Sequence, residues 1–253
     1  MLAFRIVERN LQIVRTVWLK GWIISSLVLP TMFLTAMGIG LGGVIDSRGA
    51  VQGLDYLHFV TPGLLCATAM QQGAGDSMWP VLGGVRWDHR YVAMVSTPLS
   101  PRDVQTAELL WVALRTTATS IGFLLVAAVL GGVASPWGVL AVPASTLTAV
   151  AFGALLAGLA IRQENDSVLS LVYRLGLMPI FLFSGTFFPV SVLPAGLRPV
   201  AWLSPLWHGV ELARDATTAD PRAVDVVHLA VLVVVIVLGT VWSRRGFQSR
   251  LSP

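Results

Sequence analysis

The sequence predicts an all-α integral membrane fold with six transmembrane helices, an N-terminal amphipathic helix at the membrane interface and an outer re-entrant helical segment. Hydrophobic residues make up 55% of the 253 residues, whereas charged residues make up only 12%. The mean hydropathy is +0.75, and uncharged runs long enough for a spanning helix, about 20 residues, recur along the chain. A soluble domain of this size could not cover so much apolar surface with so few charges. We therefore expect one transmembrane domain over residues 1–253.

Residues 1–20 predict a helix that lies on the membrane surface. Apolar residues recur there at three- and four-residue spacing among basic residues, which is typical of an amphipathic interface helix. The apolar positions are Phe4, Val7, Leu11, Val14 and Trp18, and the basic positions are Arg5, Arg9, Arg15 and Lys20. A cleaved signal peptide fits less well, because the basic region is long, contains Glu8 and precedes an apolar run longer than such peptides carry.

Six apolar runs predict the spans. Residues 116–161 carry no charge, and these 46 residues are too many for one crossing. A glycine, serine and proline cluster at residues 131–136 therefore marks a hairpin between two spans. Across the chain, the predicted spans cover residues 21–45, 56–82, 103–131, 137–160, 167–187 and 224–243.

Residues 83–102 form the longest charged connection in the first half of the chain, and we expect this loop on the cytoplasmic side. Its end carries the signals of a helix start. Ser100 occupies the N-cap, Pro101 the first helical position and Asp103 the third, as in a capping box with a carboxylate near the positive end of the helix. The third span is predicted to begin there.

Residues 188–222 predict a broken helical segment on the outer side. Prolines interrupt this semi-apolar stretch, which fits neither a continuous helix nor a soluble loop, so we expect a re-entrant segment that is buried against protein. An alternative is an interfacial anchor in which Trp202 and Trp207 lie at the level of the lipid headgroups.

The distribution of basic residues predicts that both termini face the cytoplasm. Of the 17 lysine and arginine residues, only Arg48, Arg198, Arg214 and Arg222 fall on the predicted outer side. The basic residues are scattered among the spans and form no block, so orientation in a bilayer explains them better than nucleic-acid binding. We expect a multi-pass protein of the bacterial plasma membrane.

The sequence holds no recognisable catalytic or metal-binding motif. Its one lysine, Lys20, follows Leu19, so no G-x-x-x-x-G-K-[ST] phosphate loop exists. The four histidines are far apart without an H-E-x-x-H motif. The single cysteine, Cys66, lies in an apolar run and is expected to be a small buried side chain. We expect no catalytic residue, no metal and no cofactor in this chain.

Four ionisable residues fall in or near the spans, namely Asp76, Glu108, Arg115 and Arg174. A charge in hydrocarbon costs on the order of 3 kcal/mol on insertion scales, so such residues normally face a bundle interior, a wet cavity or each other. They could line a substrate path, or they could form structural pairs near the interface with snorkelling arginines.

Three segments together resemble the ABC-2 type transporter permeases, particularly the lipo-oligosaccharide and daunorubicin-type exporters. The first runs from Phe59 to Leu65 (FVTPGLL) and continues through Asp76 to Trp79-Pro80. The second comprises Arg90-Tyr91, residues 97–103 (TPLSPRD) and residues 108–111 (ELLW). The third comprises residues 183–189 (FSGTFFP), Leu193-Pro194 and residues 204–211 (SPLWHGVE). Ala107 and Ser204 depart from the family's frequent glycine and asparagine without changing a charge.

The resemblance implies an exporter in which two permease subunits, identical or paralogous, join two separate ATPase subunits that bind ATP and Mg²⁺. It implies that the loop at residues 83–102 couples to the ATPase. Residues 86–90 combine charged side chains with an aromatic one, which is the composition of a docking surface. An ordinary solvated loop would carry similar charges and is the alternative. The coupling residues would be Arg86, Trp87, Asp88, His89, Arg90, Thr97, Pro98, Leu99, Ser100 and Asp103.

The resemblance also implies that the outer segment caps the pathway of an amphipathic substrate such as a drug, a glycolipid or a lipid-linked saccharide. Its candidate residues are Phe187, Phe188, Pro189, Pro194, Trp202, Pro205, Trp207, His208 and Glu211. A membrane enzyme using Asp76 and Glu108, or a membrane scaffold that transports nothing, are the alternative functions.

Overall fold

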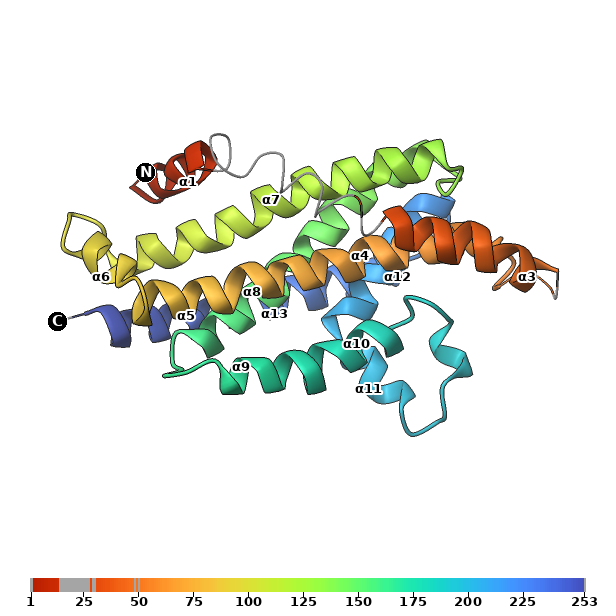
Figure 1. Cartoon of the computed structure of the whole chain (residues 1–253). Helices are drawn as coiled ribbons and strands as arrows, with labels where there is room; N and C mark the ends of the chain where they lie inside the picture. The colour runs from red at the N-terminus through yellow and green to blue at the C-terminus, as the bar shows by residue number, and fades with distance from the viewer. Residues whose placement is uncertain (1, 14–27, 29–30, 48, 50, 253) are drawn as a thin grey trace.

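The structure is a computed structural model that describes residues 2–13, 28, 31–47, 49 and 51–252. Within these residues the chain is helical apart from its connections, and the only β pairing is an isolated bridge between Val51 and Leu54. The helices run roughly along one long axis as an elongated bundle (Figure 1). Residues 14–20 of the predicted interface helix, and residues 21–27 and 29–30 of the first predicted span, lie outside the described residues.

The helical elements follow one another in this order: α1 (Leu2–Ile13), η2 (Thr35–Leu41), α3 (Gly42–Asp46), α4 (Tyr56–Ser77), α5 (Trp79–Arg86), α6 (Arg90–Val95), α7 (Pro101–Val129), η3 (Pro136–Leu140), α8 (Ala141–Ala160), α9 (Ser167–Val172), η4 (Tyr173–Leu177), α10 (Met178–Phe183), η5 (Val190–Val192), α11 (Arg198–Leu203), α12 (Pro205–Thr218) and α13 (Asp225–Leu251).

In the described part of the chain, three helices are long and apolar enough to cross a membrane: α7, the continuous η3–α8 pair and α13. Two further apolar helices, Thr31–Asp46 and Ser167–Phe183, are shorter. α4 is 22 residues long, and most of its residues are buried. The all-helical class predicted from the sequence is confirmed.

The core of the bundle is built around α8, which packs most extensively against α4 and α13 and also contacts α7 and α12. Small residues allow this packing. A Cβ atom on Gly73 of α4 would collide with the backbone carbonyl of Ala149 on α8, and one on Gly153 would lie 2.9 Å from the Ser77 hydroxyl. The backbones of α4 and α8 therefore touch directly, as small residues permit in membrane helices.

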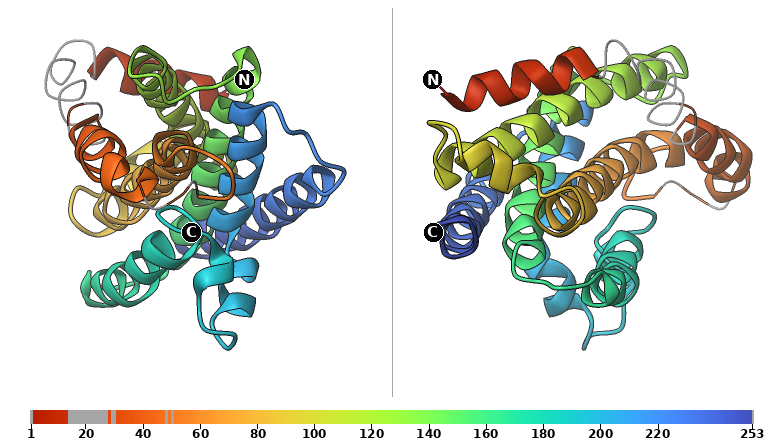
Figure 2. Two further views of the ribbon diagram at one scale, coloured as in Figure 1. Left: turned by 90° about the vertical axis from the view of Figure 1, so that its right-hand side faces the viewer. Right: turned by 60° about the vertical axis from the view of Figure 1, so that its left-hand side comes forward.

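The bundle has two distinct ends. The chain termini, α1 and α6 lie together at one end, which we call the terminal end (Figure 1). The other end, called the distal end, carries α3, the α7–η3 hairpin and the segment around α11, and the two turned views show the same arrangement (Figure 2). The predicted coupling and outer segments thus lie at opposite ends.

Several helix boundaries differ from the sequence prediction. The helix predicted for residues 56–82 continues past Asp76 as expected, but it breaks at Met78 because Pro80, near the start of α5, cannot continue the hydrogen bonding of α4. The helix of the fifth predicted span ends at Phe183, before residue 187, in a turn where Gly185 has a φ of +79°. Residues 83–102 are partly helical through the end of α5 and through α6.

Candidate functional site

The terminal end contains a buried polar cluster centred on Glu108 of α7. The side chain of Glu108 is buried, and the fully buried Tyr91 of α6 donates its hydroxyl to the carboxylate. Burial and the neighbouring carboxylate hold the pKa of Tyr91 well above its ordinary value. Arg9 of α1 and Arg90 of α6 both act electrostatically on Glu108. One carboxylate therefore connects three elements of the terminal end.

Arg90 holds α6 against α5. Its Nη2 donates to the Pro80 carbonyl at 2.9 Å and to the Tyr91 hydroxyl at 3.3 Å. The ring of Tyr91 packs on the backbone of Gly84, where a Cβ atom would lie 2.7 Å from the ring, and it contacts the Phe247 ring of α13 at a centroid distance of 5.8 Å. Residue 84 has to be glycine for this packing to form.

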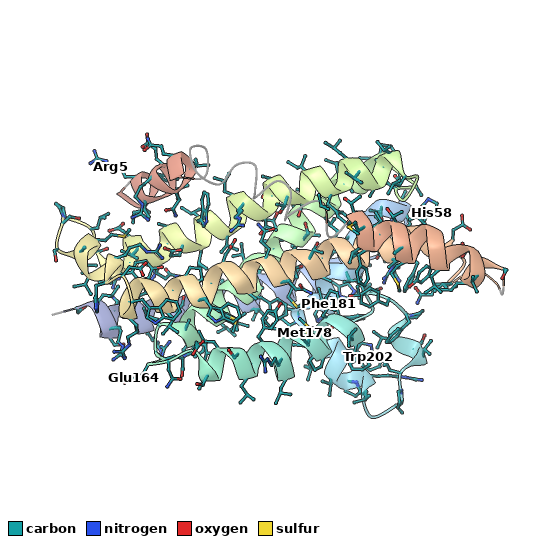
Figure 3. The ribbon with its side chains drawn as sticks, in the orientation of Figure 1. Arg5, His58, Glu164, Met178, Phe181 and Trp202 are labelled. Carbon is teal, nitrogen blue, oxygen red and sulfur yellow. The ribbon has the colours of Figure 1, made fainter. Side chains whose placement is uncertain are left out.

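The predicted coupling residues separate into anchored and exposed groups. Arg86 is anchored, because it pairs with Glu164 at 2.5 Å, and Glu164 also pairs with Arg250 of α13 at 3.0 Å. Figure 3 shows Glu164 at the terminal end in the connection between α8 and α9. Trp87 is 60% exposed. Asp88 and His89 are also exposed, and His89 has a φ of +50° in the turn before α6.

The remaining coupling candidates shape the connection between α6 and α7. Ser100 and Asp103 form the predicted capping box, with the Ser100 amide donating to the Asp103 carboxylate at 3.0 Å, so that prediction is confirmed. The Thr97 hydroxyl donates to the Met94 carbonyl at 2.6 Å. Pro98 is exposed, whereas Leu99 packs against the core.

The four predicted intramembrane charges do not form one group. Asp76 of α4 and Arg115 of α7 form an ion pair at 2.5 Å, and Gln72 accepts from Thr119 at 2.7 Å one turn further along the same two helices. Glu108 lies close enough to act electrostatically on Asp76. Arg174 stands apart, exposed on η4.

At the distal end, Arg214 of α12 connects three segments. Its guanidinium is buried and donates to Glu211 at 2.6 Å and to the Gly185 carbonyl at 2.7 Å. It also lies over the Phe59 ring of α4, 4.1 Å from the centroid. The sequence prediction missed Arg214 as a site residue. Its three-residue spacing from Glu211 on a helix was the available signal.

A second distal cluster joins α12 to α13. The Nδ1 atoms of His208 and His228 lie 2.7 Å apart, and the Trp207 ring contacts both imidazoles at centroid distances of 4.9 Å. One imidazole must donate and the other accept, so one of the two Nδ1 atoms carries a proton and the other does not. His228 was missed because twenty residues separate it from His208 in the sequence.

The other candidates of the outer segment form turns and aromatic contacts. Phe187 contacts Phe33 and Phe181 at centroid distances of 5.7 and 5.2 Å, and Phe188 contacts Phe183 at 6.3 Å. Three prolines shape the turns: Pro189 caps η5, Pro194 follows it, and Pro205 begins α12 after its N-cap Ser204. Trp202 is 48% exposed and lies at the distal end (Figure 3).

Among the residues that the structure describes, no three histidine, cysteine, aspartate or glutamate side chains gather as metal ligands. The polar groups instead pair with one another between helices. This arrangement suits side chains that hold neighbouring helices in register.

The sequence model of the family described as "ABC-2 type transporter" matches residues 6–217. The chain belongs to the ABC-2 type transporter family. The match begins within α1 and ends within α12, so it includes Glu108 and Arg214 but not His228 of α13. An ABC-2 type transporter is a membrane transport protein, so the family agrees with the three apolar helices of membrane-spanning length among the described residues.

Several curated relatives of this ABC-2 type protein are named nodulation protein J. The relative from Rhizobium leguminosarum bv. viciae is 28% identical over 233 residues, which is 90% of this chain and 87% of the relative. The relative from Sinorhizobium fredii is 28% identical over 90% of this chain and 86% of its own. The relative from Neorhizobium galegae is 29% identical over 85% and 81%.

Proposed function

We propose that this chain is the transmembrane permease subunit of an ATP-binding-cassette exporter in the bacterial plasma membrane. In this proposal a separate ABC ATPase binds ATP and Mg²⁺, and a second permease subunit, identical or paralogous, completes the transporter. The observation that carries the proposal is the exposed turn at residues 87–89, which the buried contacts of Tyr91 and Glu108 fix to the membrane helix α7.

The proposed topology has six crossings with the terminal end in the cytoplasm. α7, η3–α8 and α13 supply three crossings, α4 with α5 a fourth, and the helices that include Thr31–Asp46 and Ser167–Phe183 the other two. The excess of lysine and arginine on the cytoplasmic side supports this orientation. It places the coupling turn inside the cell and the segment from η5 to α12 outside, as a re-entrant cap.

The proposed coupling step is a push on the turn at residues 87–89 when the ATPase subunits bind ATP and approach each other. Trp87 offers an exposed aromatic anchor of the kind that dominates protein interfaces. Arg90 and Tyr91 would pass the displacement to α5 and α7 through the Pro80 carbonyl and Glu108. Glu108 is well suited to this step, because separating its buried carboxylate from Tyr91 or Arg90 would cost free energy. The contact would therefore be kept while the elements move.

The proposed substrate is amphipathic: a drug, a glycolipid or a lipid-linked saccharide. The path would run between the two permease subunits, beside η4. There Arg174 is exposed between Leu171 and Leu175, which are 56% and 71% exposed. An arginine in an apolar helix requires a wet path or a partner at that face. Membrane lipid would cover the other apolar faces.

Co-purification tests this proposal. The tagged chain would be extracted in detergent together with its ATPase, and the ATPase activity of the eluate would be measured. We expect Trp87→Ala to lower the recovered ATPase by on the order of tenfold, because it removes the exposed anchor of the docking turn.

Trp202→Ala is the matched control, since it removes an exposed tryptophan at the distal end and should leave recovery unchanged. Equal recovery in both variants would place the docking surface elsewhere. A chain that binds no ATPase and catalyses a turnover dependent on Asp76 or Glu108 would be an enzyme, and one that binds no ATPase and has no turnover would be a scaffold.

A further inference from the structure

A pocket of about 740 Å³ opens on the distal half of the bundle between η3–α8, α12 and the start of α13. The connection between α12 and α13 extends away from the rest of the bundle (Figure 2). The pocket lies on the side of α8, α12 and α13, away from the proposed path beside η4. Its lining residues include Trp137, Leu140, Leu147, Leu212, Asp215 and Leu229. Its volume is within the range of sites that bind small molecules.

The walls are almost entirely apolar, but Asp215 and Asp225 lie at one margin of the pocket. Asp215 is only 3% exposed and accepts from the Nε of Arg222 at 2.8 Å. The Asp225 Oδ2 accepts from the backbone amide of Arg222 at 2.9 Å. The Asp225 Oδ1 is buried and has no hydrogen-bond partner within the described part of the chain. Two carboxylates withdrawn from water are costly, so a cation held at this margin of the pocket would stabilise them.

The charge at this margin is negative. The Asp215 and Asp225 side chains lie within hydrogen-bonding reach of each other. The Arg222 guanidinium pairs with Asp215 and Glu211, whereas Asp225 accepts from the Arg222 backbone amide. Glu211 and Asp220 also face Arg222, while Arg214 is the other nearby cation. Four carboxylates therefore surround two guanidiniums. Burial, followed by the proximity of Asp225, raises the pKa of Asp215 to about 6 although Arg222 opposes the shift.

We propose that this pocket binds an amphiphile with a protonated amine head and an apolar chain. The ammonium would lie at the margin of the pocket beside the Asp215 and Asp225 carboxylates, and the chain would lie along Leu147, Leu212 and Leu229. An ammonium supplies both the missing donors and the missing positive charge. A carboxylate head would be repelled, and an alcohol would supply a donor without the charge. This binding does not depend on the transport proposed above.

Photolabelling of the full chain tests the site. The protein would be reconstituted in nanodiscs of phosphatidylglycerol, which carries no amine, and labelled with a long-chain alkylamine bearing a diazirine at its chain end. Mass spectrometry should locate the label on the pocket walls from α8, α12 and α13. Dodecylamine should compete for this label, whereas dodecanol and dodecanoate should compete roughly tenfold less well. Equal competition by all three would overturn the proposal, because the pocket would then select only an apolar chain.

Two variants keep the test falsifiable. Asp225→Asn retains the acceptor for the Arg222 amide but removes the charge, and should reduce the competed labelling roughly tenfold. Asp55→Asn makes the same charge change at an exposed residue just before α4, outside the pocket lining, and should change it little. Leu147→Trp fills the apolar wall and should abolish labelling by volume alone. Similar labelling of Asp225→Asn and wild type, with both folded by thermal unfolding, would exclude the ammonium site.

Discussion

Asp76 and Arg115 form an ion pair with 2.5 Å between Oδ1 and Nη1, which ties α4 to α7 inside the bundle. The two side chains are 12% and 27% exposed, so both charges are largely withdrawn from solvent. The sequence left open whether the four ionisable residues in or near the spans line a path or form structural pairs, and two of them form a pair. Asp76 and Arg115 stabilise each other, while Glu108 belongs to the terminal-end cluster and Arg174 remains exposed at η4.

Neutralising one member of this pair should destabilise the protein. We expect Asp76→Asn to cost on the order of 3 kcal/mol, because it leaves Arg115 withdrawn from water beside a neutral side chain. Unfolding by titration with a denaturing detergent would measure the change. The exchanged pair, Asp76→Arg with Arg115→Asp, should recover part of the loss. If the exchanged pair is as unstable as the sum of the single variants, then packing and not charge pairing holds this position.

Glu108 is expected to act as a positioning residue for coupling. Glu108→Gln keeps the volume of the side chain but weakens its attraction for Arg9 and Arg90, so transport per ATP hydrolysed should fall while ATPase recovery stays normal. The ratio of transport to hydrolysis in proteoliposomes measures this effect. Glu8→Gln, an exposed neutralisation on α1, is the control. A parallel loss of ATPase binding and coupling would show a purely structural role.

Arg214 should stabilise the distal end through its two charge-assisted hydrogen bonds. Arg214→Lys cannot reach both Glu211 and the Gly185 carbonyl in the same way, and we expect a loss of roughly 2 kcal/mol. Detergent unfolding again provides the measurement. Arg245→Lys, an exposed position on α13, should change stability by less than about 0.5 kcal/mol. Equal effects of the two variants would contradict the importance of the Arg214 contacts.

The orientation can be tested with cysteine substitutions, because the single native cysteine, Cys66, is fully buried and should not react. Asp220→Cys places a thiol at the distal end, and Asp88→Cys places one at the terminal end. A membrane-impermeant maleimide added to intact cells should label the first and not the second. Inverted vesicles should give the opposite result. Labelling of Asp88→Cys in intact cells would reverse the proposed topology.

Amine binding in the distal pocket should weaken in mild acid. The pKa of Asp215 is raised to about 6, so its carboxylate loses its charge as the pH falls from about 7.5 to about 5, whereas an alkylamine stays protonated throughout. The groups that face Asp215 are Arg222, Asp225 and Glu211, with Arg214 nearby. Photolabelling at both pH values measures the change, and constant labelling would exclude Asp215 from the site.

Local features were predictable from the sequence, and contacts between distant segments were not. The capping box of Ser100 and Asp103 is a pattern of four residues, and it forms as expected. Two other contacts depend on how α4, α6 and α7 pack: Tyr91 with Glu108, and Asp76 with Arg115. The spacing of these residues along the sequence does not reveal that packing. The sequence indicated that buried charges need partners, but it did not indicate which partners they have.

The same limit applies to the distal end. The prolines and Trp202 indicated a broken segment, and the structure has the separate short helices η5, α11 and α12 there. The buried role of Arg214, however, depends on a carbonyl that Gly185 presents 29 residues away. The anchored state of Arg86 likewise depends on Glu164, 78 residues away. Composition alone made residues 86–90 look like one docking surface.

The direct backbone contact of Gly73 with Ala149 restricts how this protein can change shape. No side chain lies between α4 and α8 at that point, so neither helix can slide or rotate past the other without a steric clash. These two helices should therefore remain a fixed frame throughout a working cycle. We expect the displacement that opens a passage to occur in the segment from α9 to α10. The π-helical turn at Tyr173–Leu177 in this segment already departs from regular α-helical hydrogen bonding.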